Sequence, residues 1–243
     1  MRYAIFSDVH GNLEALRVVL GFFAERKVDR YVFLGDAVGY GASPDEVCDL
    51  IRPLVSHAVL GNHDAAVVGR MPFDEYYDAA RASLDWCARQ LKPINKQWLV
   101  DLPYTDSDDT FAYCHGSPAL PEAFDYLFSK KQVREVAAIK GPLPHVTLIG
   151  HSHLTLGFRV QDTQVDSMVR SEILIDEDAS YILTVGSVGQ PRDRDPRACC
   201  CTYDTDEGIF RYHRLEYDVL TARQRVHDAG LSPVFGDRLL VGM

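Results

Sequence analysis

The chain has 243 residues, of which 47% are hydrophobic and 25% charged, a balance typical of a folded globular protein. Its formal net charge of −10 disfavours non-specific binding to DNA or RNA, because an acidic surface repels polyanions. No stretch approaches the roughly 20 consecutive apolar residues of a membrane helix, and the N-terminus turns polar too early for a signal peptide. We therefore expect a cytoplasmic protein that does not bind membranes.

The first 60 residues alternate between short apolar runs and segments with helical spacing of apolar residues. The expected elements are strands at 3–7, 31–34 and 58–60 and helices at 13–26 and 44–51. This alternation predicts a parallel sheet with helices packed on it.

The rest of the chain begins with helices and then becomes rich in strands. Helices are expected at 73–90, 94–99, 129–139, 219–229 and 234–241, and strands at 110–115, 146–149, 156–160, 172–175, 181–185, 198–203 and 208–215. This pattern predicts an α/β protein with two packed sheets flanked by helices. We expect one domain over residues 1–243, with the C-terminal helices (about 217–243) packed on it.

The six cysteines are expected to be reduced thiols, because they show no zinc-site spacing and no secretory signal precedes them. An apolar run contains Cys199, Cys200 and Cys201, so we expect these three side chains to pack in the core. Cys114 precedes a histidine at the end of a predicted strand, so strand alternation should point it into the core.

Five polar clusters each follow a predicted strand, where an open α/β sheet places its ligand-binding loops. They are Asp8-Val9-His10, Gly35-Asp36, Gly61-Asn62-His63-Asp64, His115-Gly116 and Gly150-His151-Ser152-His153. Each cluster alone is weak evidence, because Asp-x-His, Gly-Asp and His-x-His pairs are common in turns and on surfaces. Their coincidence at five strand ends predicts a metal site. In an extended backbone, side chains two residues apart point to the same side. We therefore expect Asp8 and His10 to point in one direction, and likewise His151 and His153.

The order and spacing of these clusters resemble the calcineurin-like metallophosphoesterase superfamily. The runs Gly35-Asp36-Ala37-Val38-Gly39-Tyr40-Gly41 and Gly186-Ser187-Val188-Gly189-Gln190-Pro191-Arg192 extend the resemblance to its small prokaryotic predicted-phosphodiesterase branch. The resemblance implies a four-layer α-β-β-α sandwich, in which two mixed β-sheets lie between helices.

The resemblance also implies a role for each residue of the clusters. Asp8, His10 and His153 would bind a first metal ion, Asn62, His115 and His151 a second, and Asp36 would bridge the two. His63 would donate a proton to the leaving group, with Asp64 nearby to orient it. The imidazole and oxygen donors suit two divalent ions of Mn, Fe, Co, Ni or Zn.

The expected activity is hydrolysis of a small phosphate ester, most simply a diester, by in-line attack of metal-bound hydroxide. A phosphomonoesterase or nucleotide phosphatase of the same mechanism is one alternative, and a non-catalytic scaffold that retains the fold is another. The segment after Gly35-Asp36 lacks the arginine found in protein phosphatases and dinucleoside-tetraphosphate hydrolases of this superfamily, which disfavours their substrates.

Two further residues are candidates for substrate binding. Arg192 either contacts the substrate phosphate or belongs to a solvated, salt-bridged turn. Tyr40 either stacks on a base or packs within its loop.

Overall fold

The computed structural model describes residues 1–72 and 76–243. Its strands are β1 (Arg2–Phe6), β2 (Arg30–Phe33), β3 (His57–Ala58), β4 (Thr105–Ser107), β5 (Ala112–Cys114), β6 (Val146–Ile149), β7 (Gly157–Gln161), β8 (Gln164–Met168), β9 (Glu172–Leu174), β10 (Ser180–Thr184), β11 (Ala198–Asp204) and β12 (Ile209–Leu215). Its helices are α1 (Leu13–Glu25), α2 (Pro44–Ile51), α3 (Asn62–Val67), α4 (Asp78–Gln90), α5 (Pro93–Asp101), α6 (Lys130–Lys140), α7 (Val219–Asp228) and α8 (Pro233–Asp237), with 3-10 turns at Pro121–Ala123 and Arg238–Leu240.

The strands form two mixed sheets of six strands each. The first has the order β3-β2-β1-β11-β12-β9 and the second the order β4-β5-β6-β10-β7-β8. In the first sheet β1, β2 and β3 are parallel, and in the second β5, β6 and β10 are parallel. The carboxyl ends of these parallel strands carry the polar clusters.

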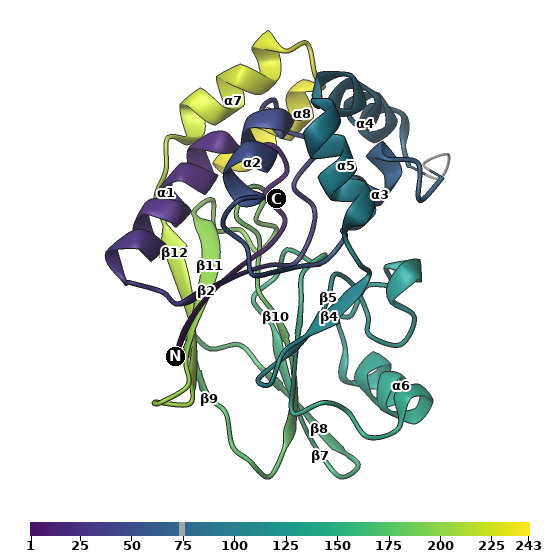
Figure 1. Ribbon diagram of the computed structural model, residues 1–243, viewed down its shortest axis with the longest axis vertical. Helices are drawn as coiled ribbons and strands as arrows, with labels where there is room; N and C mark the ends of the chain where they lie inside the picture. The colour runs from purple at the N-terminus through teal and green to yellow at the C-terminus, as the bar shows by residue number, and fades with distance from the viewer. Residues whose placement is uncertain (73–75) are drawn as a thin grey trace.

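Side chains along β1 alternate between the two faces of the first sheet and therefore belong to two separate parts of the core. Tyr3 and Ile5 pack between the sheets, whereas Ala4 and Phe6 face the helices of the first sheet. That helical layer includes α1, which buries Leu16 and Phe23 completely. On the outer face of the second sheet, α6 packs near β8 (Figure 1). The predicted four-layer sandwich of two mixed sheets flanked by helices is confirmed.

The C-terminal helices lie next to the beginning of the chain. In Figure 1, α7 runs beside α1, where Arg225 of α7 forms an ion pair with Glu14 at 2.6 Å. The backbone carbonyl of Phe235 in α8 accepts a hydrogen bond from the Gln190 side chain. The loop around residue 190 is therefore held by the C-terminal segment.

Several predicted elements differ from those observed. Strand β4, strand β8 and helix α3 were not predicted, because their sequences are short and largely polar. The beginning of the helix expected at 73–90 lies outside the described residues, and the observed helix α4 begins at Asp78. Within the described residues, no helix is long and apolar enough to cross a membrane.

Candidate metal centre

All seven predicted metal ligands are brought together at the carboxyl ends of the parallel strands. Each of them is buried, with an exposed fraction of 7% or less; they are Asp8, His10, Asp36, Asn62, His115, His151 and His153. Since buried carboxylates and imidazoles are costly without partners, so dense a polar cluster in the interior indicates a ligand site.

The backbone at this centre is not extended, so the reasoning from two-residue spacing was wrong. Asp8 and His10 have φ angles of 54° and 48°, and His151 and His153 have φ angles of 63° and 59°. These values lie in the left-handed region, which is sparsely populated by residues other than glycine. As a result, His151 and His153 point to different groups of donors.

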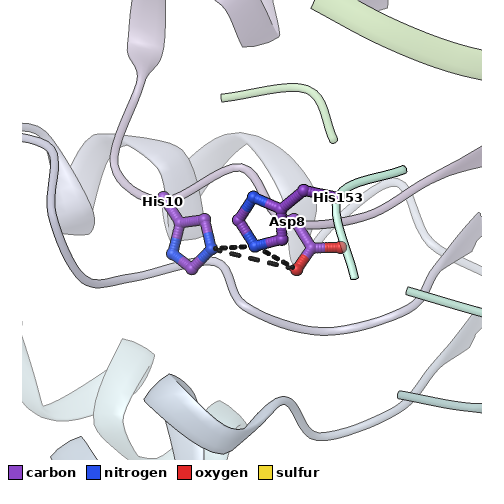
Figure 2. A group of neighbouring side chains, drawn as sticks. All are labelled: Asp8, His10 and His153. Atoms are coloured by element: carbon purple, nitrogen blue, oxygen red, sulfur yellow. Dashed lines mark hydrogen bonds and ion pairs between the residues drawn. The ribbon is translucent and has the colours of Figure 1, made fainter. Parts of the chain in front are cut away.

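Asp8, His10 and His153 form the first donor group and point toward one another (Figure 2). The Oδ1 atom of Asp8 lies 3.1 Å from Nε2 of His153 and 3.8 Å from Nε2 of His10. Its other oxygen, Oδ2, accepts a hydrogen bond from the backbone amide of His151. Asp8 Oδ1 has no hydrogen-bond partner among the described residues, although it is fully buried.

The protonation of these imidazoles leaves both of them able to bind a cation. Nδ1 of His10 donates to the carbonyl of Val38, and Nδ1 of His153 donates to that of Gln190. Because burial lowers the pKa of both imidazoles, each is neutral and each Nε2 carries a lone pair. These two Nε2 atoms lie only 3.2 Å apart. Two facing lone pairs repel each other, and a metal ion between them would remove the repulsion.

Asp36, Asn62, His115 and His151 form the second donor group. Nε2 of His115 lies 3.4 Å from Oδ2 of Asp36 and 3.2 Å from Oδ1 of Asn62. The donor atoms of Asp36, His115 and His151 lie within 4.8 Å of one another. His115 Nδ1 donates to the carbonyl of Leu34, so its Nε2 also faces the group.

Asp36 lies between the two donor groups. Its Oδ2 atom is 3.6 Å from Nε2 of His10 and 3.4 Å from Nε2 of His115. Its Oδ1 atom accepts a hydrogen bond from the backbone amide of His63. One carboxylate oxygen is therefore within reach of both groups.

The electrostatics of the centre favour positive charge. Burial alone would raise the pKa of Asp36, but the neighbouring imidazoles, His115 foremost, hold it well below its usual range. Burial likewise opposes protonation of His115, yet Asp36 raises the pKa of His115 to about 9. The carboxylates thus hold a proton on His115 Nε2, and a divalent transition metal could take the place of that proton among the same donors.

His63 lies beside this centre, in the first turn of α3. Its ring packs near that of His10, with centroids 4.8 Å apart, and its Nδ1 atom is buried without a hydrogen-bond partner among the described residues. Burial lowers the pKa of His63 to about 4, against the opposing charge of Asp36.

Asp64 does not orient His63 in the way we expected. Its carboxylate instead accepts hydrogen bonds from the backbone amides of Asp36 at 2.7 Å and Val38 at 3.2 Å. The reason is the unpredicted helix α3, in which consecutive residues point in different directions. Asp64 therefore fixes the loop that presents Asp36.

A cavity of about 450 Å³ opens over the centre. It is lined by the polar side chains of Asn62, His63, His151, Arg192 and Arg238 and by the remaining residues Tyr40, Met71, Tyr76, Tyr77, Ala123, Phe124 and Tyr126. A cavity of this size accommodates a small organic ligand beside Asn62 and His151 of the second donor group.

Arg192 and Tyr40 have different surroundings. Arg192 lines the cavity, whereas the ion pairs of its loop are formed by Asp193 with Arg214 and by Asp195 with Arg197. The backbone amide of Arg192 also donates to the carbonyl of His153. Tyr40 is only 6% exposed and its ring contacts His63 and Phe235, which favours loop packing over stacking on a base.

Sequence reasoning missed two groups of cavity residues. Arg238 lies 85 residues after His153, the last residue of the strand-end motifs, in a C-terminal segment without a motif of its own. Tyr126 stacks on His151 with ring centroids 3.9 Å apart. No local pattern could have placed either residue here, since both depend on how distant segments pack.

The buried cysteines have the structural roles that the sequence predicted. Cys199, Cys200 and Cys201 are completely buried within β11. Cys114 packs with the core residues on the α6 side of the second sheet. All six cysteines are free thiols.

Comparison with known proteins agrees with the geometry of the centre. The family model described as calcineurin-like phosphoesterase matches residues 1–182. An uncharacterized protein of Methanocaldococcus jannaschii is 34% identical over 244 residues, which cover 98% of this chain and 97% of that protein.

Solved structures show the same arrangement over the full length of the chain. A metallophosphoesterase from Sphaerobacter thermophilus is 32% identical, with a TM-score of 0.85 over 100% of this chain and 99% of that one. A hypothetical protein from Pyrococcus horikoshii OT3 is 21% identical and shares the fold, with a TM-score of 0.79 over 100% and 98% of the two chains. By its sequence and its fold, the chain belongs to the calcineurin-like phosphoesterase family.

Proposed function

We propose that this phosphoesterase uses two divalent metal ions to hydrolyse a small phosphodiester. The observation that carries the proposal is the position of Asp36, whose Oδ2 atom lies within 3.6 Å of Nε2 atoms from both donor groups. Asp8, His10 and His153 would hold one ion, and Asn62, His115 and His151 the other. When bound, such a pair of ions polarises the phosphoryl group and supplies a nucleophile from water at neutral pH.

The surrounding residues orient these donors. The amide nitrogen of Asn62 donates a hydrogen bond to the hydroxyl of Tyr76, which leaves its carbonyl oxygen directed at His115. Backbone carbonyls hold the imidazoles of His10, His115 and His153 through their Nδ1 atoms. Contacts of this kind preserve ligand geometry and raise the affinity for a metal.

His63 is the proposed proton donor to the leaving group. It lines the cavity, and its Nδ1 atom is unpaired among residues 1–72 and 76–243. Burial keeps the imidazole neutral in the free protein, since its pKa is about 4. A phosphate anion bound beside it would favour the protonated form, so we infer that His63 becomes an acid only in the substrate complex.

The cavity wall favours a diester over a monoester. Apolar and aromatic side chains such as Met71, Tyr76 and Phe124 line much of it. A diester brings two organic groups to the phosphorus, and such a wall would contact the second one. We propose, in keeping with the acidic composition, that the substrate is small and that the chain acts in the cytoplasm.

The test compares the metal-loaded protein on bis-p-nitrophenyl phosphate and on p-nitrophenyl phosphate, which share a leaving group. We expect kcat/KM to be at least about tenfold higher for the diester, a difference of about 1.4 kcal/mol in transition-state binding. A preference for the monoester would instead identify a phosphomonoesterase.

A further inference from the structure

Arg238 projects a second guanidinium into the cavity from the C-terminal end of the chain. It begins the 3-10 turn Arg238–Leu240, directly after α8. Its Cζ atom lies 4.4 Å from the ring centroid of Tyr40 and 5.1 Å from that of Phe235. The same Tyr40 ring adjoins His10 and His63, with centroids 4.7 and 4.5 Å away. One tyrosine ring thus contacts both Arg238 and two imidazoles at the metal centre.

The guanidinium of Arg238 has unused hydrogen-bonding capacity. Its Nε and Nη2 atoms are buried and have no hydrogen-bond partner among the described residues. Burial lowers the pKa of Arg238, and the nearby charge of Arg192 lowers it further. A buried donor without an acceptor is unfavourable, and more so when it is charged, so this arrangement favours an anionic ligand.

The charge around the cavity leads to the same conclusion. Arg192 and Arg238 both line it, and none of its described lining residues is acidic. This concentration of positive charge occurs in a chain whose formal net charge is −10. A scissile phosphodiester carries one negative charge, which the metal centre would meet, so the charge on Arg238 remains available for another group.

We propose that Arg238 binds a second anionic group of the substrate, a phosphate or a carboxylate, in the same cavity as the scissile phosphate. This inference rests on the proposed function, which places the scissile phosphate at the two donor groups. It makes Arg238 a specificity-determining residue and the substrate class a phosphate ester with at least one further anionic group. The paired guanidinium and anion would form charge-assisted hydrogen bonds.

The test measures binding, so it does not depend on turnover. Calorimetry of the Mn²⁺-loaded protein compares thymidine 5′-phosphate with thymidine 3′,5′-bisphosphate, which differ only in the second phosphate. Chromatography after each titration verifies that the ligand is intact. For the unmodified protein we expect the bisphosphate to bind about 10-fold to 100-fold more tightly, as hydrogen bonds to a charged group would provide.

Arg238→Gln should abolish most of the difference in affinity between the bisphosphate and the monophosphate. It should change the affinity for thymidine 5′-phosphate by less than about threefold. Arg238→Lys keeps the charge and should retain a larger part of the difference. Arg223→Gln is the matched control, because Arg223 also carries its charge on the C-terminal helices but pairs with Asp237 at 2.6 Å outside the cavity. Thermal melting of all variants identifies any loss of folding.

Equal affinity of the unmodified protein for both nucleotides would overturn the proposal. So would an equal loss for both nucleotides in a folded Arg238→Gln variant, or an Arg238→Lys variant that behaves like Arg238→Gln. These outcomes are independent of the proposed activity, which fails separately if the same preparation does not hydrolyse bis-p-nitrophenyl phosphate.

Discussion

The floor and the wall of the cavity are built in different ways. We use floor for the buried donors of the metal centre next to the cavity lining, such as Asp8, Asp36 and His115, which are all 1% exposed or less and held by backbone hydrogen bonds. The wall combines side chains from unrelated segments, including Tyr126, which is 42% exposed, and Arg238 near the C-terminus. Under the proposed function, we expect the floor to determine the reaction and the wall to determine the substrate. Changes to the floor should therefore affect every substrate, and changes to the wall only some.

The largest effect is expected from Asp36→Asn in the floor. The amide oxygen can still accept the hydrogen bond from the backbone of His63, so we expect the fold to survive. The anionic oxygen between His10 and His115 is lost, and hydrolysis should fall below detection on every ester. This loss should exceed the about 10²-fold to 10⁴-fold contribution of a general acid. Undiminished hydrolysis of bis-p-nitrophenyl phosphate by this variant would refute the shared role of Asp36.

His63→Ala should have the next largest effect, and its size should depend on the leaving group. Esters with alkoxide leaving groups need a proton, so we expect their kcat to fall by about 10²-fold or more. p-Nitrophenyl esters leave without protonation and should lose less than about tenfold. Rates for the variant on one ester of each kind measure the ratio, and equal losses would show that His63 is not the acid.

Asp64→Asn should have a smaller effect, through the loop that carries Asp36. Both oxygens of the carboxylate accept hydrogen bonds from backbone amides, Oδ1 from Val38 and Oδ2 from Asp36 and Gly61, whereas an amide side chain offers only one oxygen. We expect the free energy of unfolding to fall by about 1–3 kcal/mol. Urea denaturation measures this change, while activity per folded molecule should fall about 10-fold to 100-fold. An unchanged denaturation midpoint would contradict the role given to Asp64.

The smallest effect is expected from Tyr126→Leu in the wall. Stacking on His151 at 3.9 Å contributes about 0.5–1.5 kcal/mol beyond the buried area. We expect metal affinity to fall by a factor of about 2 to 10, with a change in KM that differs among esters. Titration of the metal-free variant with Mn²⁺ measures the affinity. If Tyr126→Leu lowered hydrolysis of every ester as much as Asp36→Asn does, the distinction between floor and wall would be contradicted.

The residues of the floor could be predicted from the sequence because each of them lies in a short local pattern. Apolar strands followed by polar residues at Asp8, Asp36 and His115 specify both an element and its functional end. The sheet brings these ends together, so the five clusters could be named before their contacts were known, and the family resemblance then selected seven donors among their residues.

Other features depend on backbone conformation and long-range packing. The left-handed φ angles at His151 and His153 direct their side chains to different donor groups, although their spacing had predicted the same direction. Helix α3 redirects Asp64 from His63 to the loop of Asp36. The position of Arg238 follows from the docking of the C-terminal helices, which no short pattern encodes.

Metal content and activity of the same preparation test the central claim most directly. The chain is stripped with a chelator, titrated with Mn²⁺, and assayed on bis-p-nitrophenyl phosphate, with bound metal measured by mass spectrometry at each step. The account predicts no hydrolysis without metal and full activity only as the content approaches two ions per chain. Hydrolysis by the stripped protein, or full activity at one ion per chain, would contradict it.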